Sequence, residues 1–292
     1  MKTQLATSFF KPQGNIKAVM LVVHGKAEHR KRYDEFATAL SERGIGVLTY
    51  DQRGHGDSVS DTSDLGYFGS KDGWLNLVED AAEFLKQLKR EYRVPVILFG
   101  HSMGSMVSRC VLKRYEELID AVILSGAPNY VPVAGAGRAV AKLISAFGEK
   151  KRSNLLHNMA DGGFIKAIDN PETEVDWLSY DKENVKKYIA DPLCGFSFTA
   201  RGYQDLMSLL VDMHQIEKKT KKNYLPILFV SGADDPCTGG AKGLEDSIAV
   251  LKETGYEKIT NLVYENARHE ILNEKISDKV IEDIVQWIEK AF

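Results

Sequence analysis

Apolar residues gather in short runs that recur along this chain. Six runs rich in β-branched residues cover positions 19–23, 46–50, 96–99, 121–124, 227–230 and 259–264. Most of them are too short for helices and lack the alternation of polar and apolar residues that a half-buried strand shows. Because this pattern is typical of strands buried on both faces of a sheet, we predict a strand at each run.

Helical patterns lie between the predicted strands. Segments 33–43, 74–92 and 278–292 place apolar residues three and four positions apart, so that each has one apolar face. In 74–92 this face consists of Leu77, Ala81, Phe84, Leu85 and Leu88. Strands that alternate with helices form a mostly parallel sheet covered by helices, and we predict this α/β architecture.

The alternation stops between residues 128 and 198, where turn sequences separate short amphipathic pieces. We predict an inserted helical cap at 128–198, between a first part of the α/β core at 1–127 and a second part at 199–292. An insertion after the carboxyl end of a strand lies over the crevice in which open α/β sheets bind ligands. A separate domain is the alternative, but about 70 residues bury only a thin core of their own.

One amphipathic piece of the predicted cap has a pronounced apolar stripe. The stripe consists of Val140, Leu143, Ile144 and Phe147. These side chains are expected either to line an apolar tunnel or to pack on the sheet.

Composition and charge narrow the class of protein. The chain has 292 residues, of which 43% are hydrophobic and 27% charged, as in an ordinary globular protein. A net charge of -3 and a pI near 6.2 argue against a nucleic-acid-binding surface. No apolar stretch is long enough for a transmembrane helix, and the N-terminus lacks the apolar region of a secretion signal.

The cysteines indicate a reduced protein. Cys110, Cys194 and Cys237 are odd in number and show no metal-like spacing, so we expect a cytoplasmic protein. The sequence HEILN lacks the second histidine of a zinc H-E-x-x-H motif, and GAGRAV lacks the last glycine of a nucleotide-binding motif. We therefore predict no metal and no cofactor.

The sequence GHSMG at residues 100–104 marks a candidate nucleophile. It fits G-x-S-x-G, in which a serine stands at the tip of a strained turn between a strand and a helix. A strand is predicted directly before it and an apolar helical pattern directly after it, which is the context that gives this short motif weight. Ser102 is the predicted nucleophile.

A serine nucleophile needs a base and a group that orients the base. Among seven histidines, His269 directly follows the last predicted strand, where parallel sheets display catalytic groups. The orienting carboxylate is expected between serine and histidine in the chain. The sequence SGADDP supplies two aspartates, and counting three residues past Gly232 selects Asp235 over Asp234.

A serine nucleophile that attacks a carbonyl also needs two backbone N–H groups that stabilise the developing oxyanion. One comes from the residue after the nucleophile, which is Met103, and the other from a loop after an early strand. The sequence HGK at 24–26 is that loop, and Lys26 is the predicted second donor.

With these residues assigned, the chain resembles the α/β-hydrolase superfamily over essentially its full length. Within it, the chain is similar to the monoacylglycerol lipase and lysophospholipase group, through HGKAEHRKRY, DQRGHGDS, GHSMG, SGADDP and RHEILNE in this order. The resemblance implies a serine hydrolase that needs no cofactor, cleaves acyl esters and has a mobile cap that admits the acyl chain. It further implies that Glu28 and Arg32 lie near the site and contact a polar head group. Asp51, Arg53 and His55 match a turn that we interpret as structural.

The leading hypothesis is a serine carboxylic ester hydrolase acting on a small acyl ester, of the monoacylglycerol or lysophospholipid type. Transient contact between the cap and a membrane surface is expected with such substrates. An aminopeptidase or a short-chain esterase of the same fold is the enzyme alternative, and a hydrolase-fold ligand-binding protein is the non-enzyme alternative.

Cys237 is expected either to lie at the site or to fill core space. The oligomeric state is left open.

Overall fold

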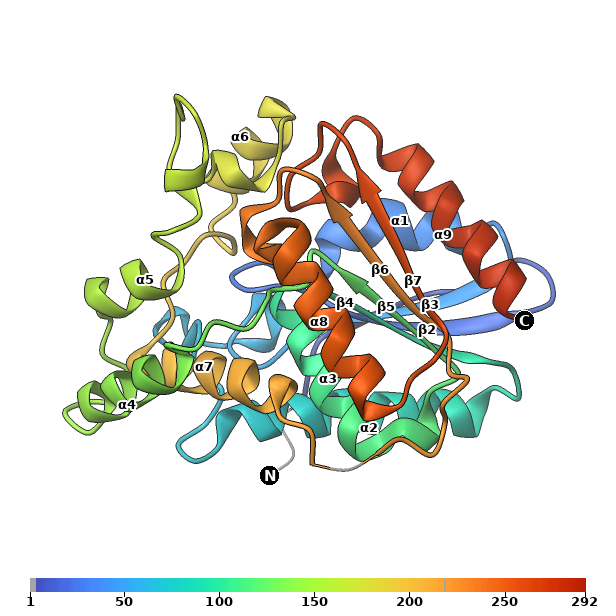
Figure 1. Ribbon diagram of the computed structural model, residues 1–292, viewed down its shortest axis with the longest axis horizontal. Coiled ribbons are helices and arrows are strands. Elements are labelled where there is room, and N and C mark those ends of the chain that lie inside the picture. Colours follow the sequence, from blue (N-terminus) through green and yellow to red (C-terminus); the bar gives the residue numbers. More distant parts are fainter. Residues whose placement is uncertain (1–3, 218) are drawn as a thin grey trace.

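A seven-stranded sheet forms the centre of the computed structural model, which describes residues 4–217 and 219–292 (Figure 1). Its strand order is β1-β3-β2-β4-β5-β6-β7. The strands are β1 (Thr7–Phe10), β2 (Ala18–Val23), β3 (Ile45–Tyr50), β4 (Val96–His101), β5 (Ala121–Ser125), β6 (Ile227–Gly232) and β7 (Ile259–Tyr264). All neighbours pair in parallel except β1, which runs antiparallel to β3.

The predicted mostly parallel sheet is confirmed, and all six predicted strands are present. The sequence analysis missed β1, a four-residue edge strand whose residues are only partly buried. Only two of its four residues, Phe9 and Phe10, are apolar, because the faces of this edge strand are only partly covered.

Helices cover both faces of the sheet. Helices α1 (Asp34–Ser41) and α9 (Ser277–Ala291) lie on one face, and α2 (Gly73–Glu91), α3 (Met103–Tyr115) and α8 (Gly240–Thr254) lie on the other (Figure 1). Strand β2 shows why the strands lack polar alternation. Val19, Leu21 and Val23 enter the core under α2 and α3, whereas Met20 and Val22 enter the core under α1 and α9.

Four α-helices lie between β5 and β6 in the described part of the chain. They are α4 (Ala134–Ser145), α5 (Asn154–Ala160), α6 (Lys182–Ala190) and α7 (Ala200–His214). Helix α7 packs against α3 and α4, while α4, α5 and α6 stand apart from the sheet at one side of the molecule (Figure 1). The first three helices fall in the segment for which the sequence predicts a cap, and the limits 128–198 stay a prediction. We call residues 128–198 the insert.

The apolar stripe of α4 corrects an expectation. Leu143 is 65% exposed and Phe147, just after the helix, is 80% exposed, whereas Ile144 is half-buried against the core. Leu143 and Phe147 therefore neither line a tunnel nor pack on the sheet. Helix α4 packs its small residues Ala134, Gly137 and Ala141 inward, so its larger apolar residues lie on the surface.

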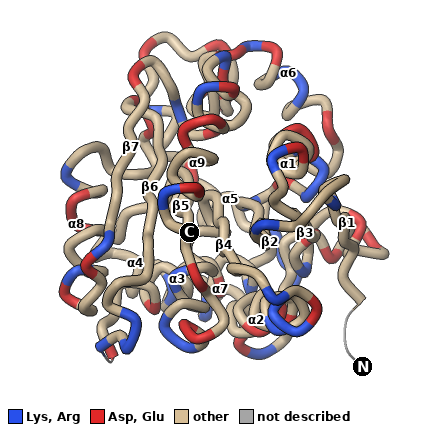
Figure 2. Tube along the Cα trace, turned by 90° about the vertical axis from the view of Figure 1, so that its right-hand side faces the viewer, with Lys and Arg blue, Asp and Glu red and all other residues tan. Residues whose placement is uncertain are grey.

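Charges of both signs are interspersed over the outer helices and loops (Figure 2). No segment among the described residues shows the long run of positive charge that nucleic-acid binding requires. Within the same residues, no helix combines the length and the apolar character that crossing a bilayer demands.

A sharp turn joins β4 to α3 and places Ser102 at its tip. Ser102 has φ 52° and ψ −120°, a conformation that a residue with a side chain rarely adopts. The turn is held by the Ser102 N–H, which donates to the Ser125 carbonyl at 2.9 Å. Helix α3 approaches the end of β2 so closely that a Cβ on Gly104 would stand 2.0 Å from the Val23 carbonyl oxygen.

This close approach predicts that Gly104→Ala destabilises the protein by about 3 kcal/mol or more, because a backbone oxygen cannot yield to the new methyl group. Gly135→Ala, in α4, is the control. A Cβ there meets no atom within 4 Å, so the change is expected to leave the free energy of unfolding equal or slightly higher. Urea unfolding of both variants measures the difference, and equal effects would contradict the packing argument.

Candidate active site

Loops that follow four parallel strands meet around one cavity of about 700 Å³. Ser102 follows β4, Glu28 lies in the loop after β2, Cys237 follows β6 and His269 follows β7, and all four line the cavity. This is the carboxyl edge of the sheet, where α/β folds bind ligands. The insert and α7 complete the wall with mostly apolar side chains.

The predicted base and acid are in contact. His269 Nδ1 and Asp235 Oδ2 are 2.9 Å apart, and both side chains are almost fully buried. The other oxygen of Asp235 accepts the Cys237 N–H at 2.8 Å, so the carboxylate is fixed at both ends. Burial acts to lower the pKa of His269, but the Asp235 charge and hydrogen bond outweigh it and raise this pKa above its ordinary value of 6.5.

Asp235, and not Asp234, faces the imidazole. Asp234 instead accepts a hydrogen bond from the exposed Tyr180 hydroxyl at 3.0 Å. Cys237 is buried and lines the same cavity as Ser102. Burial raises the pKa of this thiol well above its ordinary value, so it is not a thiolate at neutral pH.

The two predicted oxyanion donors flank Ser102. A Cβ on Gly25 would stand 3.2 Å from the Ser102 Cβ, which shows how closely the loop after β2 passes the serine. Met103 is the first residue of α3, where a helix has no acceptor of its own for the backbone N–H. Lys26 N–H donates no hydrogen bond to any of the described residues. Neither N–H is committed to an acceptor among the described residues, and their role as oxyanion donors stays a prediction.

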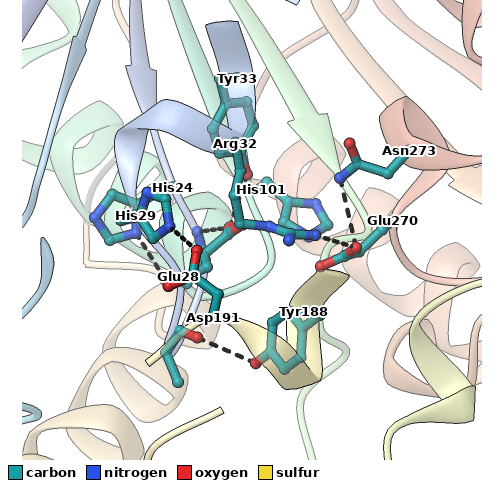
Figure 3. A network of polar contacts seen from close by, with 12 residues as sticks. His24, Glu28, His29, Arg32, Tyr33, His101, Tyr188, Asp191, Glu270 and Asn273 are labelled. Carbon is teal, nitrogen blue, oxygen red and sulfur yellow. Dashed lines mark hydrogen bonds and ion pairs between the residues drawn. The ribbon is translucent and has the colours of Figure 1, made fainter. Parts of the chain in front are cut away.

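A buried ion-pair network fixes this loop (Figure 3). Glu28 accepts hydrogen bonds from the Gly25 N–H and, at 2.8 Å, from the Tyr33 hydroxyl. Arg32 lies between two carboxylates, with its Nε 3.2 Å from Glu28 and its Nη2 2.5 Å from Glu270 (Figure 3). Because Glu270 is next to His269, the network ties the loop that carries Lys26 to the loop that carries His269.

The network also reaches the insert. Asn184 of α6 donates to Glu270 at 2.7 Å and accepts from Arg32 at 3.2 Å. Sequence reasoning did not identify Glu270 or Asn184. The sequence RHEILNE contains Glu270 but gives no sign of its partner Arg32, and no motif marks Asn184.

The two residues expected at a head group occupy different positions. Glu28 lines the cavity, whereas Arg32 lies behind it and is not part of the cavity wall. Burial acts to raise the pKa of Glu28, but His101 and Arg32 outweigh it and lower this pKa. Burial raises the pKa of Glu270, and the Glu28 charge adds to the effect. One arginine thus faces two carboxyl groups.

The side chain of Lys26 forms a second link to the insert. Its Nζ lies 2.7 Å from Asp161, and both side chains line the cavity. The same Nζ stands 5.0 Å from the centre of the Phe198 ring. His157 Nδ1 lies 3.0 Å from the same Asp161 carboxylate. Sequence reasoning did not identify this role of Asp161, because an ion pair across 135 positions leaves no local signal.

The DQRGHGDS turn supports the loop after β2, in line with the interpretation that it is structural. Asp51 is fully buried and accepts the Arg30 N–H at 2.7 Å. His55 Nε2 accepts the Ala27 N–H at 3.3 Å. Arg53 forms an ion pair with Asp80 of α2.

Two groups of side chains have the spacing of metal ligands. Among the described residues, His29, Asp191 and Cys194 form one group, and Asp235, Cys237 and His269 form the other, with ligand atoms within 4.8 Å. In each group a hydrogen bond already joins the histidine to the aspartate. The second group contains the two residues that the sequence predicts as base and acid.

A family model described as "Serine aminopeptidase, S33" matches residues 14–276. The chain belongs to this family. It is also 26% identical to the monoglyceride lipase of Mus musculus over 96% of this chain and 85% of that protein. Identity to the monoacylglycerol lipase of Mycolicibacterium smegmatis is 27%, over 95% of this chain and 90% of that protein.

A solved structure supports the same relationship. A thermostable carboxyl esterase from Bacillus coagulans, in complex with glycerol, superposes with a TM-score of 0.88 and 27% identity, over 99% of this chain and 95% of that chain. The predicted resemblance to α/β-hydrolases of the monoacylglycerol lipase group is confirmed. The protein is therefore a hydrolase of the lipase and esterase kind.

The contact between His269 and Asp235 predicts that Asp235→Asn slows ester hydrolysis by a factor on the order of 10⁴. The residual activity should also persist to lower pH, because the raised pKa of His269 depends on the Asp235 charge and protonated imidazole cannot act as a base. Asp234→Asn is the matched control and should leave both rate and pH profile nearly unchanged. A larger loss for Asp234→Asn would contradict the assignment.

Proposed function

We propose that this hydrolase cleaves monoacylglycerol through an acyl-enzyme formed on Ser102. The observation that carries the proposal is the strained Ser102 at the edge of a large cavity that it shares with His269, itself paired to Asp235. A serine side chain, a base and a buried orienting carboxylate on three strand-following loops are the parts that acyl transfer requires.

In the proposed reaction, Ser102 Oγ attacks the acyl carbon while His269 takes the hydroxyl proton. The imidazolium then gives this proton to the leaving alcohol, and Asp235 keeps Nδ1–H oriented throughout. The N–H groups of Lys26 and Met103 stabilise the negative charge on the acyl oxygen. Water then attacks the acyl-enzyme, with His269 again accepting the proton, and releases the fatty acid.

The size and lining of the cavity support a long acyl chain. Its wall includes apolar residues of α3 and α7, namely Met106, Leu206, Met207 and Leu210. Each methylene group that leaves water for such a surface contributes roughly 0.8 kcal/mol. Catalytic efficiency is therefore expected to rise with acyl length until the cavity is full.

The polar end of the cavity favours glycerol over a phosphorylated head group. Glu28, Glu270 and Tyr188 line it beside Ser102, and Arg32 behind them is already paired to both carboxylates. Carboxylates accept hydrogen bonds from hydroxyl groups. The same carboxylates repel a phosphodiester, so we propose monoacylglycerol rather than lysophospholipid as substrate and assign Arg32 an indirect role through Glu28 and Glu270.

An exposed apolar surface beside the cavity supports contact with a lipid surface. Val133 is 71% exposed and Met159 is 47% exposed, and both also line the cavity. Leu143 and Phe147 extend this surface along α4. We define the α4 surface as Val133, Leu143, Phe147 and Met159. Exposed apolar residues next to a substrate cavity are typical of proteins that take substrate from a membrane.

Aminopeptidase activity is a second candidate. The matching family model is described as a serine aminopeptidase, and two carboxylates beside Ser102 are suited to bind an α-ammonium group. A short-chain esterase is the third possibility within the same mechanism. The aminopeptidase and the short-chain esterase differ from the proposed lipase in how kcat/KM depends on acyl length and head group.

A substrate panel tests the proposal. It compares p-nitrophenyl esters of increasing chain length, an aminoacyl p-nitroanilide, and 2-monoacylglycerol beside lysophosphatidylglycerol of the same chain, whose head group carries a net negative charge. We expect kcat/KM to rise with chain length and to favour monoacylglycerol over the phospholipid by at least about tenfold, as repulsion between partly buried like charges implies. Preference for acetyl esters or for the anilide would contradict the proposal.

The α4 surface predicts a selective effect of Leu143→Ser combined with Phe147→Ser. Hydrolysis of monoacylglycerol in phosphatidylcholine vesicles should fall by more than about tenfold, because up to roughly 2 kcal/mol of membrane burial is lost for each of the two large apolar side chains. Hydrolysis of dissolved p-nitrophenyl butyrate should not change. Val263→Ser, which alters an exposed apolar residue of β7, is the control, and an equal loss in that variant would contradict the prediction.

A further inference from the structure

A second, smaller cavity lies at the carboxyl-terminal half of α3, whereas the turn at Ser102 lies at the start of that helix. It is bounded by the carboxyl-terminal half of α3, the loop after α7 and the end of α8, and its lining includes Arg109, Lys113, Met213, Thr220 and Tyr256. Its volume is about 30 Å³. A water molecule needs roughly 10–15 Å³ by this measure, so the space suits one small ion or one or two waters.

The cavity adjoins an arginine without a counter-charge. Arg109 is only 2% exposed, and its single hydrogen bond runs from Nη1 to the Met213 sulfur at 3.7 Å. Nε and Nη2 have no partner in the part of the chain that the structure describes. Burial lowers the pKa of Arg109 to about 10, so the guanidinium is still charged at neutral pH.

Nearby carboxylates are committed to other donors. Glu116 accepts from the Thr220 hydroxyl at 2.6 Å and from the Lys221 N–H at 3.0 Å. Glu217 lies 3.5 Å from Lys113. Asp246, whose charge acts on Arg109 from a distance, is half exposed and pairs with His214 at 3.5 Å. Within the described residues, no carboxylate forms an ion pair with Arg109.

We propose that this cavity binds one small monovalent anion, of the size of chloride or formate, through the Nε–H and Nη2–H groups of Arg109. A buried charge is strongly unfavourable unless an opposite charge accompanies it. The free edge of Arg109 presents two parallel N–H donors, the arrangement that binds anions most strongly. Water could accept hydrogen bonds from Arg109 but would not neutralise its positive charge. Sulfate and gluconate are too large for a cavity of about 30 Å³.

The anion connects elements that also build the catalytic cavity. Helix α3 carries Ser102 and Met103 at its start and Arg109 two turns later, and α7 contributes Met213 here and Leu210 to the larger cavity. A bound anion would therefore stabilise the packing of α3 against α7 and α8. This role is independent of the substrate proposed above.

Thermal unfolding tests the proposal on the intact protein. The melting temperature should be higher in sodium chloride or formate than in sodium gluconate of equal ionic strength, by roughly 5 °C once the anion exceeds its Kd about 100-fold. Arg109→Met should abolish the difference in melting temperature between chloride and gluconate. In gluconate this variant should melt no lower than the native protein, because the substitution removes an unpaired buried charge. Arg90→Met is the control, because Arg90 is a surface arginine of α2 with a 76% exposed side chain, and it should keep the full response.

Crystals soaked in sodium bromide give a second readout that needs no variant. We expect an anomalous peak in the small cavity, in contact with the Arg109 Nε and Nη2 atoms. Water in place of bromide would overturn the proposal, as would an equal response of native protein and Arg109→Met to chloride.

Discussion

The close packing of α3 against the end of β2 is the constraint on which the site depends. The Gly104 backbone lies against the Val23 carbonyl, and this contact leaves no room for a relaxed turn at Ser102. The positive φ of Ser102 is a strain of order 1–3 kcal/mol that the surrounding sheet and helices must offset. Because of this turn, Ser102 lies directly before helix α3 and not within it, next to the first N–H groups of the helix.

A second constraint coordinates the loops around that serine. Arg32 lies between Glu28 and Glu270, so one guanidinium holds the loop after β2, the loop of His269 and, through Asn184, the insert. The Lys26–Asp161 pair links the loop after β2 to the insert a second time. The position of the insert and the position of this loop are therefore fixed by the same polar contacts.

The sequence predicted those features that leave a local pattern. Buried strands such as β2 and β4 appear as apolar runs, and the turn at Ser102 appears as glycines at fixed spacing. Asp235 and His269 could be selected because each follows a strand. Glu270, Asn184 and Asp161 could not, because their partners lie 86 to 238 positions away and a buried ion pair has no periodicity. The outward face of α4 was misjudged because an amphipathic pattern does not tell which face packs when the inward residues are alanine and glycine.

The central claim is that Ser102 carries the acyl group during hydrolysis. Mass spectrometry of the protein quenched in acid during turnover of a p-nitrophenyl ester tests it directly. The account predicts a mass increase equal to the acyl group, located on the peptide that contains Ser102, and its absence in Ser102→Ala. An adduct on another residue, or turnover retained by Ser102→Ala, would contradict it.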